Sequence, residues 1–160
     1  MSIRTISVQV ENHSGTLSRI SGLFASRGYN INSLTVGETE DPSISRMTIV
    51  VGGDDSVIEQ VVKQLNRLID VIKVIDFGDD PLIERELILV RVDASKSNRH
   101  EIVELANIFG ASVAHVGISS MTLELSAACD KADSFVNLIR PYGIKELIRT
   151  GKVAMAQPRK

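Results

Sequence analysis

The chain has 160 residues, of which 43% are hydrophobic and 24% are charged, and its formal net charge is −2. This composition predicts an ordinary globular protein, and so small a net charge excludes the strong positive field that recruits nucleic acid or an anionic membrane. The single Cys129 cannot form an internal disulfide, and no apolar run is near the roughly 20 residues that span a bilayer. No signal segment precedes the first strand pattern, so we expect a cytoplasmic protein.

The first predicted elements are a strand and a helix. Residues 5–10 alternate apolar and polar side chains, which is typical of a strand with one buried face. Leu17, Ile20 and Phe24 then recur at helical spacing, and Gly28 follows as the expected left-handed end of the helix.

A hairpin, a second helix and a closing strand complete the first half. Two alternating runs at 34–36 and 47–51 flank a polar turn and predict a β-hairpin. Ser56 and Glu59 have the spacing of a capping box, which predicts a helix that begins there. The β-branched stretch 71–77 predicts the closing strand, and the glycine, aspartates and proline that follow it mark a domain boundary.

The second half repeats this order of elements. Asn98 and Glu101 again have capping-box spacing, and the helix that they begin is expected to end at Gly110. The other expected elements are a strand at 87–92, a hairpin of 113–118 and 121–127, a helix at 130–140 and a strand at 144–149.

These elements predict an α+β chain of two tandem ferredoxin-like βαββαβ domains, at residues 1–78 and 84–160. In this topology each antiparallel sheet carries its helices on one face. The second strand then lies at an edge of the sheet, where its free backbone groups can pair with another copy of the chain. We therefore predict a homodimer that forms through the first domain.

The loop from Glu11 to Thr16, between the first strand and the first helix, is the candidate binding site. Unpaired amide groups of a helix's first turn point into such a loop and attract a carboxylate. Gly15 has no Cβ, so a ligand can approach its backbone, and the Asn12 side chain offers both a donor and an acceptor. This combination suits an α-amino acid. A protonated His13 would lie beside the ligand carboxylate and make binding pH-sensitive.

Asn30 and Ile31, at the start of the second strand, are the expected second half of this site. Across a homodimer they would face the loop of the other copy and supply an amide group and an apolar wall. A site shared by two chains ties ligand affinity to the geometry of the assembly.

The residues also carry a resemblance that covers the chain. The N-terminal ACT domain of the small regulatory subunits of acetohydroxyacid synthase (acetolactate synthase) closely resembles the segment "ENHSGTLSRISGLFASRGYNINSLTVGETEDPSISRMTIVV". The similarity continues through "KQLNRLIDVIKV" and "ERELILV" to "IRPYGIKELIRTGKVAMA".

This resemblance implies a non-catalytic subunit that activates a thiamine-diphosphate-dependent catalytic subunit and confers feedback inhibition by valine, or by another branched-chain amino acid. It also implies that thiamine diphosphate, magnesium and FAD belong to the catalytic subunit and that this chain holds no cofactor. In such proteins the effector contacts the loop of one ACT domain and the start of the second strand of the other. The candidate effector site therefore comprises Asn12, His13, Ser14, Gly15, Thr16, Leu17, Asn30 and Ile31.

The chain departs from the family pattern in two places, the pair His13-Ser14 and Asn32. Family members commonly have Glu-Pro or Glu-Ser where this chain has His13 and Ser14, and usually an acidic residue where it has Asn32. These departures bear on the effector that the site prefers.

Other functions find less support in the residues. The three histidines are scattered over different elements, and neither Cys129 nor His115 has a metal-ligand companion, so we predict no catalytic and no metal site. An acylphosphatase-like hydrolase would need an arginine at the first loop, where the chain offers only Arg19. An RNA-binding domain of this topology would need aromatic residues in its central strands, which are absent here. A free-standing ACT-type sensor of another enzyme remains an alternative, and co-purification with a large thiamine-diphosphate enzyme would separate the two.

Overall fold

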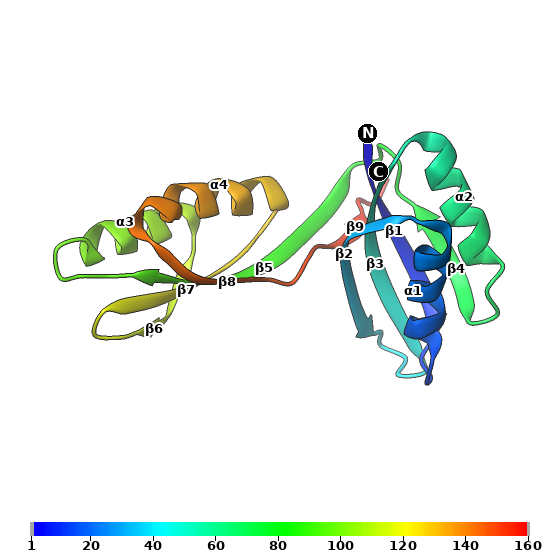
Figure 1. Cartoon of the computed structure of the whole chain (residues 1–160), viewed down its shortest axis with the longest axis horizontal. Helices are drawn as coiled ribbons and strands as arrows, with labels where there is room; N and C mark the ends of the chain where they lie inside the picture. The colour runs from blue at the N-terminus through cyan, green and yellow to red at the C-terminus, as the bar shows by residue number, and fades with distance from the viewer. Residues whose placement is uncertain (1, 160) are drawn as a thin grey trace. The chain divides into compact units, whose positions relative to one another are not determined.

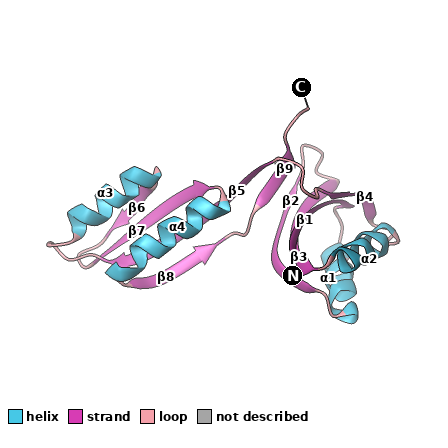
Figure 2. Ribbon diagram, turned by 90° about the horizontal axis from the view of Figure 1, so that it is seen from above, coloured by secondary structure: helices cyan, strands magenta, loops and turns pink. Residues whose placement is uncertain are grey.

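The computed structural model describes residues 2–159, and the chain divides into two compact units. The first unit runs to Ile83 and also includes the segment from Val153 onward, and the second comprises Glu84–Lys152. In each unit two helices cover one face of an antiparallel sheet (Figure 1, Figure 2). The predicted fold class, two ferredoxin-like units, is confirmed. Within residues 2–159 no helix has the length and the apolar run needed to cross a membrane.

The first unit contains its strands and helices in the predicted order. They are β1 (Ser2–Glu11), α1 (Thr16–Arg27), β2 (Asn30–Glu38), β3 (Ile44–Gly53), α2 (Asp55–Asn66) and β4 (Val71–Asp76). The strand order is β2-β3-β1-β4, and each neighbouring pair is antiparallel. β2 is therefore an edge strand, as predicted.

The core of the first unit fixes α1 on the sheet. Ile6 and Val8 of β1 are completely buried beneath the helices, and Ile20 and Phe24 of α1 are buried against them. Each such side chain contributes about 1.5–3 kcal/mol when it leaves water. α1 ends where predicted, because Gly28 adopts a left-handed φ of 68° that a glycine reaches without strain.

The beginning of α2 differs from the prediction. Asp54, not Ser56, is the N-cap residue, and its carboxylate accepts a hydrogen bond of 3.0 Å from the Val57 N–H. Ser56 Oγ donates to the same carboxylate at 2.6 Å. Glu59 pairs instead with Lys63, one turn along the helix, at 2.8 Å. The capping-box prediction was wrong because an aspartate two residues earlier caps the helix more directly.

The second face of this sheet is also covered in part. The alternation in β1 predicts that Thr5 and Ser7 face solvent, yet their exposed fractions are 7% and 1%. Arg46 of β3 donates to Ser7 Oγ at 2.8 Å and to the carbonyl oxygen of Ala154 at 3.2 Å. The C-terminal segment of the unit therefore approaches the face opposite the helices, which a reading of β1 alone does not reveal.

The second unit has the same arrangement. Its elements are β5 (Leu82–Asp93), whose first two residues belong to the first unit, α3 (Arg99–Phe109), β6 (Ser112–Val116), β7 (Ser120–Ala127), α4 (Cys129–Ile139), a 3₁₀ turn (Arg140–Tyr142) and β8 (Ile144–Arg149). The strand order is β6-β7-β5-β8. Phe135 of α4 is buried at the centre of its core and lies 5.3 Å from the ring of Phe109, measured between centroids.

The start of α3 also departs from a capping box. Asn98 precedes the helix as predicted, but its side chain accepts hydrogen bonds from the backbone and hydroxyl of Ser95 at 2.8 and 3.1 Å instead of capping the helix. Glu101 accepts a hydrogen bond of 3.1 Å from the Tyr142 hydroxyl. The end of the helix at Gly110, with a φ of 73°, agrees with the prediction.

A last strand, β9 (Val153–Ala156), was not predicted. It pairs with β5, and the Gln157 N–H donates to the carbonyl oxygen of Pro81 at 3.1 Å. The segment from Val153 onward thus groups with the first unit, whereas the sequence assigned all of residues 84–160 to the second domain.

Candidate functional site

The loop between β1 and α1 leads into a helix whose N-terminus has no side-chain cap. Gly15 occupies the N-cap position with a φ of 88°, no side chain caps the helix, and its first turn contains no acidic residue. Within residues 2–159 the backbone N–H groups of Leu17 and Ser18 have no hydrogen-bond acceptor. The open donors and the helix dipole together give this loop the capacity to bind an anionic group.

Two of the predicted site residues have their donor groups engaged inside the unit. The Asn12 amide nitrogen donates to Glu38 Oε1 at 3.1 Å and to the Pro42 carbonyl at 2.9 Å. Thr16 is buried, its hydroxyl donates to the Glu11 carbonyl at 3.1 Å, and its N–H donates to the His13 carbonyl at 3.4 Å. Asn12 retains only its side-chain amide oxygen for a ligand. The hydrogen bonds of Thr16 stabilise the conformation of the loop itself.

Exposed residues of the loop present different surfaces. Leu17 remains 46% exposed at the start of α1 and offers an apolar wall. His13 and Ser14 are also exposed. His13 Nε2 lies 3.1 Å from Glu11 Oε2 and 3.1 Å from Asp70 Oδ1, so the imidazole links the loop to the residue that precedes β4.

Asp70 and Arg19 lie beside the loop, and no pattern in the sequence predicted either of them as a site residue. Asp70 is buried and accepts a hydrogen bond from Arg19 Nε at 2.5 Å, while the Glu11 N–H donates to the Asp70 carbonyl at 2.8 Å. Glu11, His13 and Asp70 could each direct one ligand atom to a metal ion, since these atoms lie within 4.8 Å of one another. The guanidinium already neutralises Asp70, however, so we describe the group as a network of ion pairs.

The pKa of His13 is raised from its ordinary value of 6.5, chiefly by the hydrogen bond to Glu11 and then by the backbone of Ser14 and the charge of Asp70. A folded-state pKa above the unfolded value stabilises the fold fully below the unfolded pKa, and this contribution is lost as the pH rises through the folded pKa. We therefore expect the melting temperature of the wild type to fall more between about pH 5.5 and about pH 8.5 than that of His13→Gln, which cannot titrate in this range. Differential scanning fluorimetry of both proteins across that range measures the difference. Parallel melting curves at every pH would contradict it.

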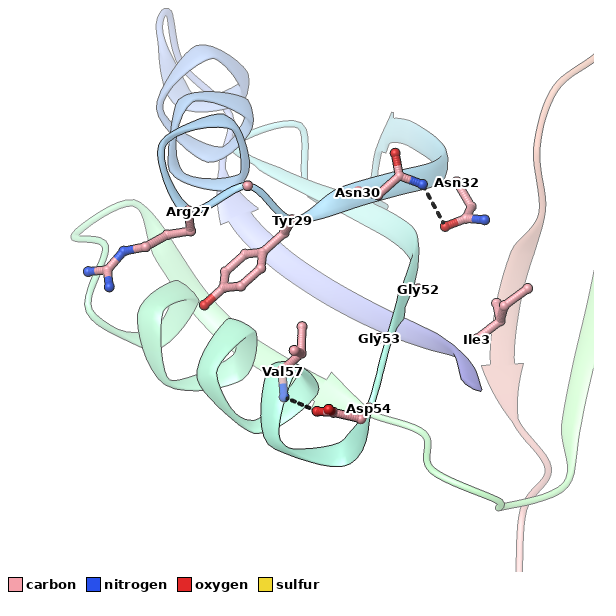
Figure 3. A pocket seen from close by; sticks show the side chains of 10 residues that line it. Ile3, Arg27, Tyr29, Asn30, Asn32, Gly52, Gly53, Asp54 and Val57 are labelled. Carbon is pink, nitrogen blue, oxygen red and sulfur yellow. Dashed lines mark hydrogen bonds between the residues drawn. The ribbon is translucent and has the colours of Figure 1, made fainter. Parts of the chain in front are cut away.

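Asn30 and Ile31 lie at the other end of α1 from the loop. The helix has 12 residues, which rise about 18 Å at 1.5 Å per residue. Asn30 lies on the wall of a cavity of about 640 Å³, together with Asn32, Tyr29 and Val57 (Figure 3). Its amide nitrogen faces Asn32 Oδ1 at 3.4 Å, and Ile31 is partly buried against the core. One chain therefore does not bring Asn30 to its own loop.

Comparisons with known proteins agree over both units. A family model described as the AHAS small subunit-like ACT domain matches residues 6–73, and one described as the small subunit of acetolactate synthase matches residues 85–158. A probable acetolactate synthase small subunit of Archaeoglobus fulgidus is 55% identical, over 98% of both chains. The chain belongs to the acetolactate synthase small-subunit family. It is thus a regulatory subunit and not the catalytic one.

Further members of the acetolactate synthase small-subunit family support this assignment. The small subunit of Aquifex aeolicus is 51% identical over 94% of this chain and 79% of its own length. The crystal structure of the small subunit from Thermotoga maritima superposes with a TM-score of 0.92, at 36% identity, over the whole of both chains. The resemblance noted in the sequence is confirmed, and a free-standing sensor and an acylphosphatase-like hydrolase are both set aside.

Proposed function

We propose that this acetolactate synthase small subunit activates the thiamine-diphosphate-dependent catalytic subunit and confers feedback inhibition by valine, bound between two copies of the first unit. The observation that carries the proposal is the position of the β1–α1 loop, with the uncapped N-terminus of α1, at one end of the edge strand β2. The family relationship supplies the catalytic partner, and the loop supplies a place for the effector. Thiamine diphosphate, magnesium and FAD would reside in the catalytic subunit, in the cytosol.

The geometry of β2 supports a site shared between two copies. The strand has nine residues and extends roughly 26 Å at about 3.3 Å per residue. Asn12 ties the loop to the Glu38 end of β2, and Asn30 forms the opposite end. If two β2 strands pair in antiparallel fashion about a two-fold axis, Asn30 of one copy lies beside Glu38 of the other, and thus beside its loop.

The groups at this place complement an amino acid. The open N–H groups of Leu17 and Ser18 would donate hydrogen bonds to the carboxylate, and the amide oxygen of Asn12 would accept a hydrogen bond from the ammonium group. The exposed Leu17 and the second copy's Ile31 would bound the aliphatic side chain. The same groups would bind valine, leucine or isoleucine, because these amino acids differ only in the aliphatic side chain.

Such a site links effector binding to the assembly. A ligand that contacts both copies favours the dimer geometry that it fits, and a coupling of about 1–3 kcal/mol gives roughly 5- to 150-fold control of the catalytic subunit. Valine would thus inhibit by stabilising a dimer geometry that no longer activates the catalytic subunit.

An interchain complementation experiment tests the shared site. Gly15→Asp removes the loop half of the site and Asn30→Leu removes the strand half, so each homodimer is expected to lose valine binding. In a heterodimer of the two variants, one site combines both mutations and the other combines the wild-type loop with the wild-type Asn30. We expect calorimetry of the mixed, refolded proteins to recover about half of the heterodimer's sites.

Two controls accompany this measurement. Co-purification with the catalytic subunit, followed by its assay with and without valine, tests activation and inhibition directly. Sedimentation equilibrium establishes the dimer. No recovery of binding in a confirmed heterodimer would place the whole site within one chain and contradict the proposal.

A further inference from the structure

Asp70 pairs with two side chains, Arg19 and His13, at the mouth of the β1–α1 loop. Its Oδ2 accepts the hydrogen bond from Arg19 Nε at 2.5 Å, and its Oδ1 lies 3.1 Å from His13 Nε2. The Asp70 side chain is only 11% exposed, whereas those of Arg19 and His13 are about half exposed. A carboxylate that has lost its water depends on such partners, so Asp70 fixes the direction of the guanidinium.

Arg19 extends back along the helix to cover Gly15. A Cβ built on Gly15 would lie 3.0 Å from Arg19 Nη1, so a ligand that reaches the open face of this glycine also meets the guanidinium. Arg19 uses Nε for Asp70, and within residues 2–159 neither Nη1 nor Nη2 donates a hydrogen bond. The two terminal amino groups therefore remain available, in the planar arrangement that suits a carboxylate.

We propose that Arg19, oriented by Asp70, binds the carboxylate of the amino-acid effector and determines the selectivity of the site for a free α-carboxylate. This inference rests on the proposed function of the loop and adds to it a charged residue from outside the loop. Asp70 is a positioning residue, because it contacts Arg19 and not the ligand. Glu11 and His13 are the other titratable side chains that face this group, and they lie 3.1 Å from each other, so the imidazole offsets the negative charge of Glu11 when it is protonated.

A lysine at position 19 is not expected to replace the arginine. It keeps the positive charge, but a single ammonium group cannot bind Asp70 and at the same time present two parallel donors to a carboxylate. Asp70→Asn has the complementary effect, since it keeps the guanidinium and weakens the bond that orients it. The two variants therefore separate charge from orientation.

The alternative role for Arg19 is purely structural, as a link between the loop and the residue that precedes β4. The backbone bond from Glu11 N–H to the Asp70 carbonyl already provides such a link at 2.8 Å. A structural role would weaken all ligands alike, so the informative quantity is the ratio of the affinities for L-valine and for L-valinamide, which lacks the carboxylate.

Isothermal titration of the full chain with both ligands tests the inference. We expect the wild type to prefer valine, Arg19→Gln to bind valine about 10- to 100-fold more weakly with valinamide binding unchanged, and Arg19→Lys and Asp70→Asn to lie between. Melting curves without ligand establish whether each variant folds. If Arg19→Gln does not fold, Arg19→Lys is the variant that tests the inference. An unchanged affinity ratio in folded Arg19 variants would overturn this inference and leave the valine site standing. If the wild type does not bind valine, the proposed function itself fails.

Discussion

Gly15→Asp is expected to abolish the stabilisation of the chain by valine. At a valine concentration of 100 times its Kd, the wild type gains about 2.7 kcal/mol of apparent stability, and the variant gains none. The new carboxylate would stand at the open face of the loop, where a Cβ added to Gly15 would lie 3.0 Å from Arg19 Nη1. It would repel the ligand carboxylate and compete for the same guanidinium. Thermal unfolding with increasing valine measures the response.

Gly15→Asn is the matched control for this variant. Asparagine has the size of aspartate and tolerates a positive φ about as well, so both variants carry a similar strain at the φ of 88°. The difference between their valine responses therefore isolates the charge. A full valine response in folded Gly15→Asp would show that the ligand does not bind at this loop.

Phe135→Ala is expected to destabilise the second unit by about 3–5 kcal/mol, because it leaves a cavity at the centre of the core. Phe135 is 1% exposed and packs against Phe109. Leu138→Ala, one turn along the same helix, is the control, since that side chain is 50% exposed and its removal should cost less than about 1 kcal/mol. Urea unfolding followed by circular dichroism gives both values. Equal losses for the two variants would contradict the assignment of this core.

The order of the elements was predictable because it is encoded by local periodicity. The period of two in β1 and the spacing of three to four residues in α1 are visible in neighbouring residues, and Gly28 and Gly110 mark helix ends by a conformation that other residues avoid. The helix starts were less predictable. Asp54, Ser56 and Asn98 are all residue types that cap helices, and only the folded backbone decides which of them does so.

The β9 strand could not be found by the same reasoning. It is four residues long and lies against the beginning of β5, and its membership of the first unit depends on a contact between distant parts of the chain. The burial of Ser7 beneath Arg46 has the same cause. A polar residue in an alternating strand indicates solvent only when nothing else covers that face.

The sequence by itself determined the two ferredoxin-like units, the edge position of β2, the candidate loop and the family, because periodicity and sequence similarity require no knowledge of long-range contacts. Tertiary structure alone decided how the side chains of that loop are used. It engages the donors of Asn12 and Thr16 within the unit, and it brings Asp70, 51 residues further along the chain than Arg19, to the mouth of the loop. The pairing of β1 with β4 sets that approach, and a pairing register is a property of the folded sheet that no local pattern expresses.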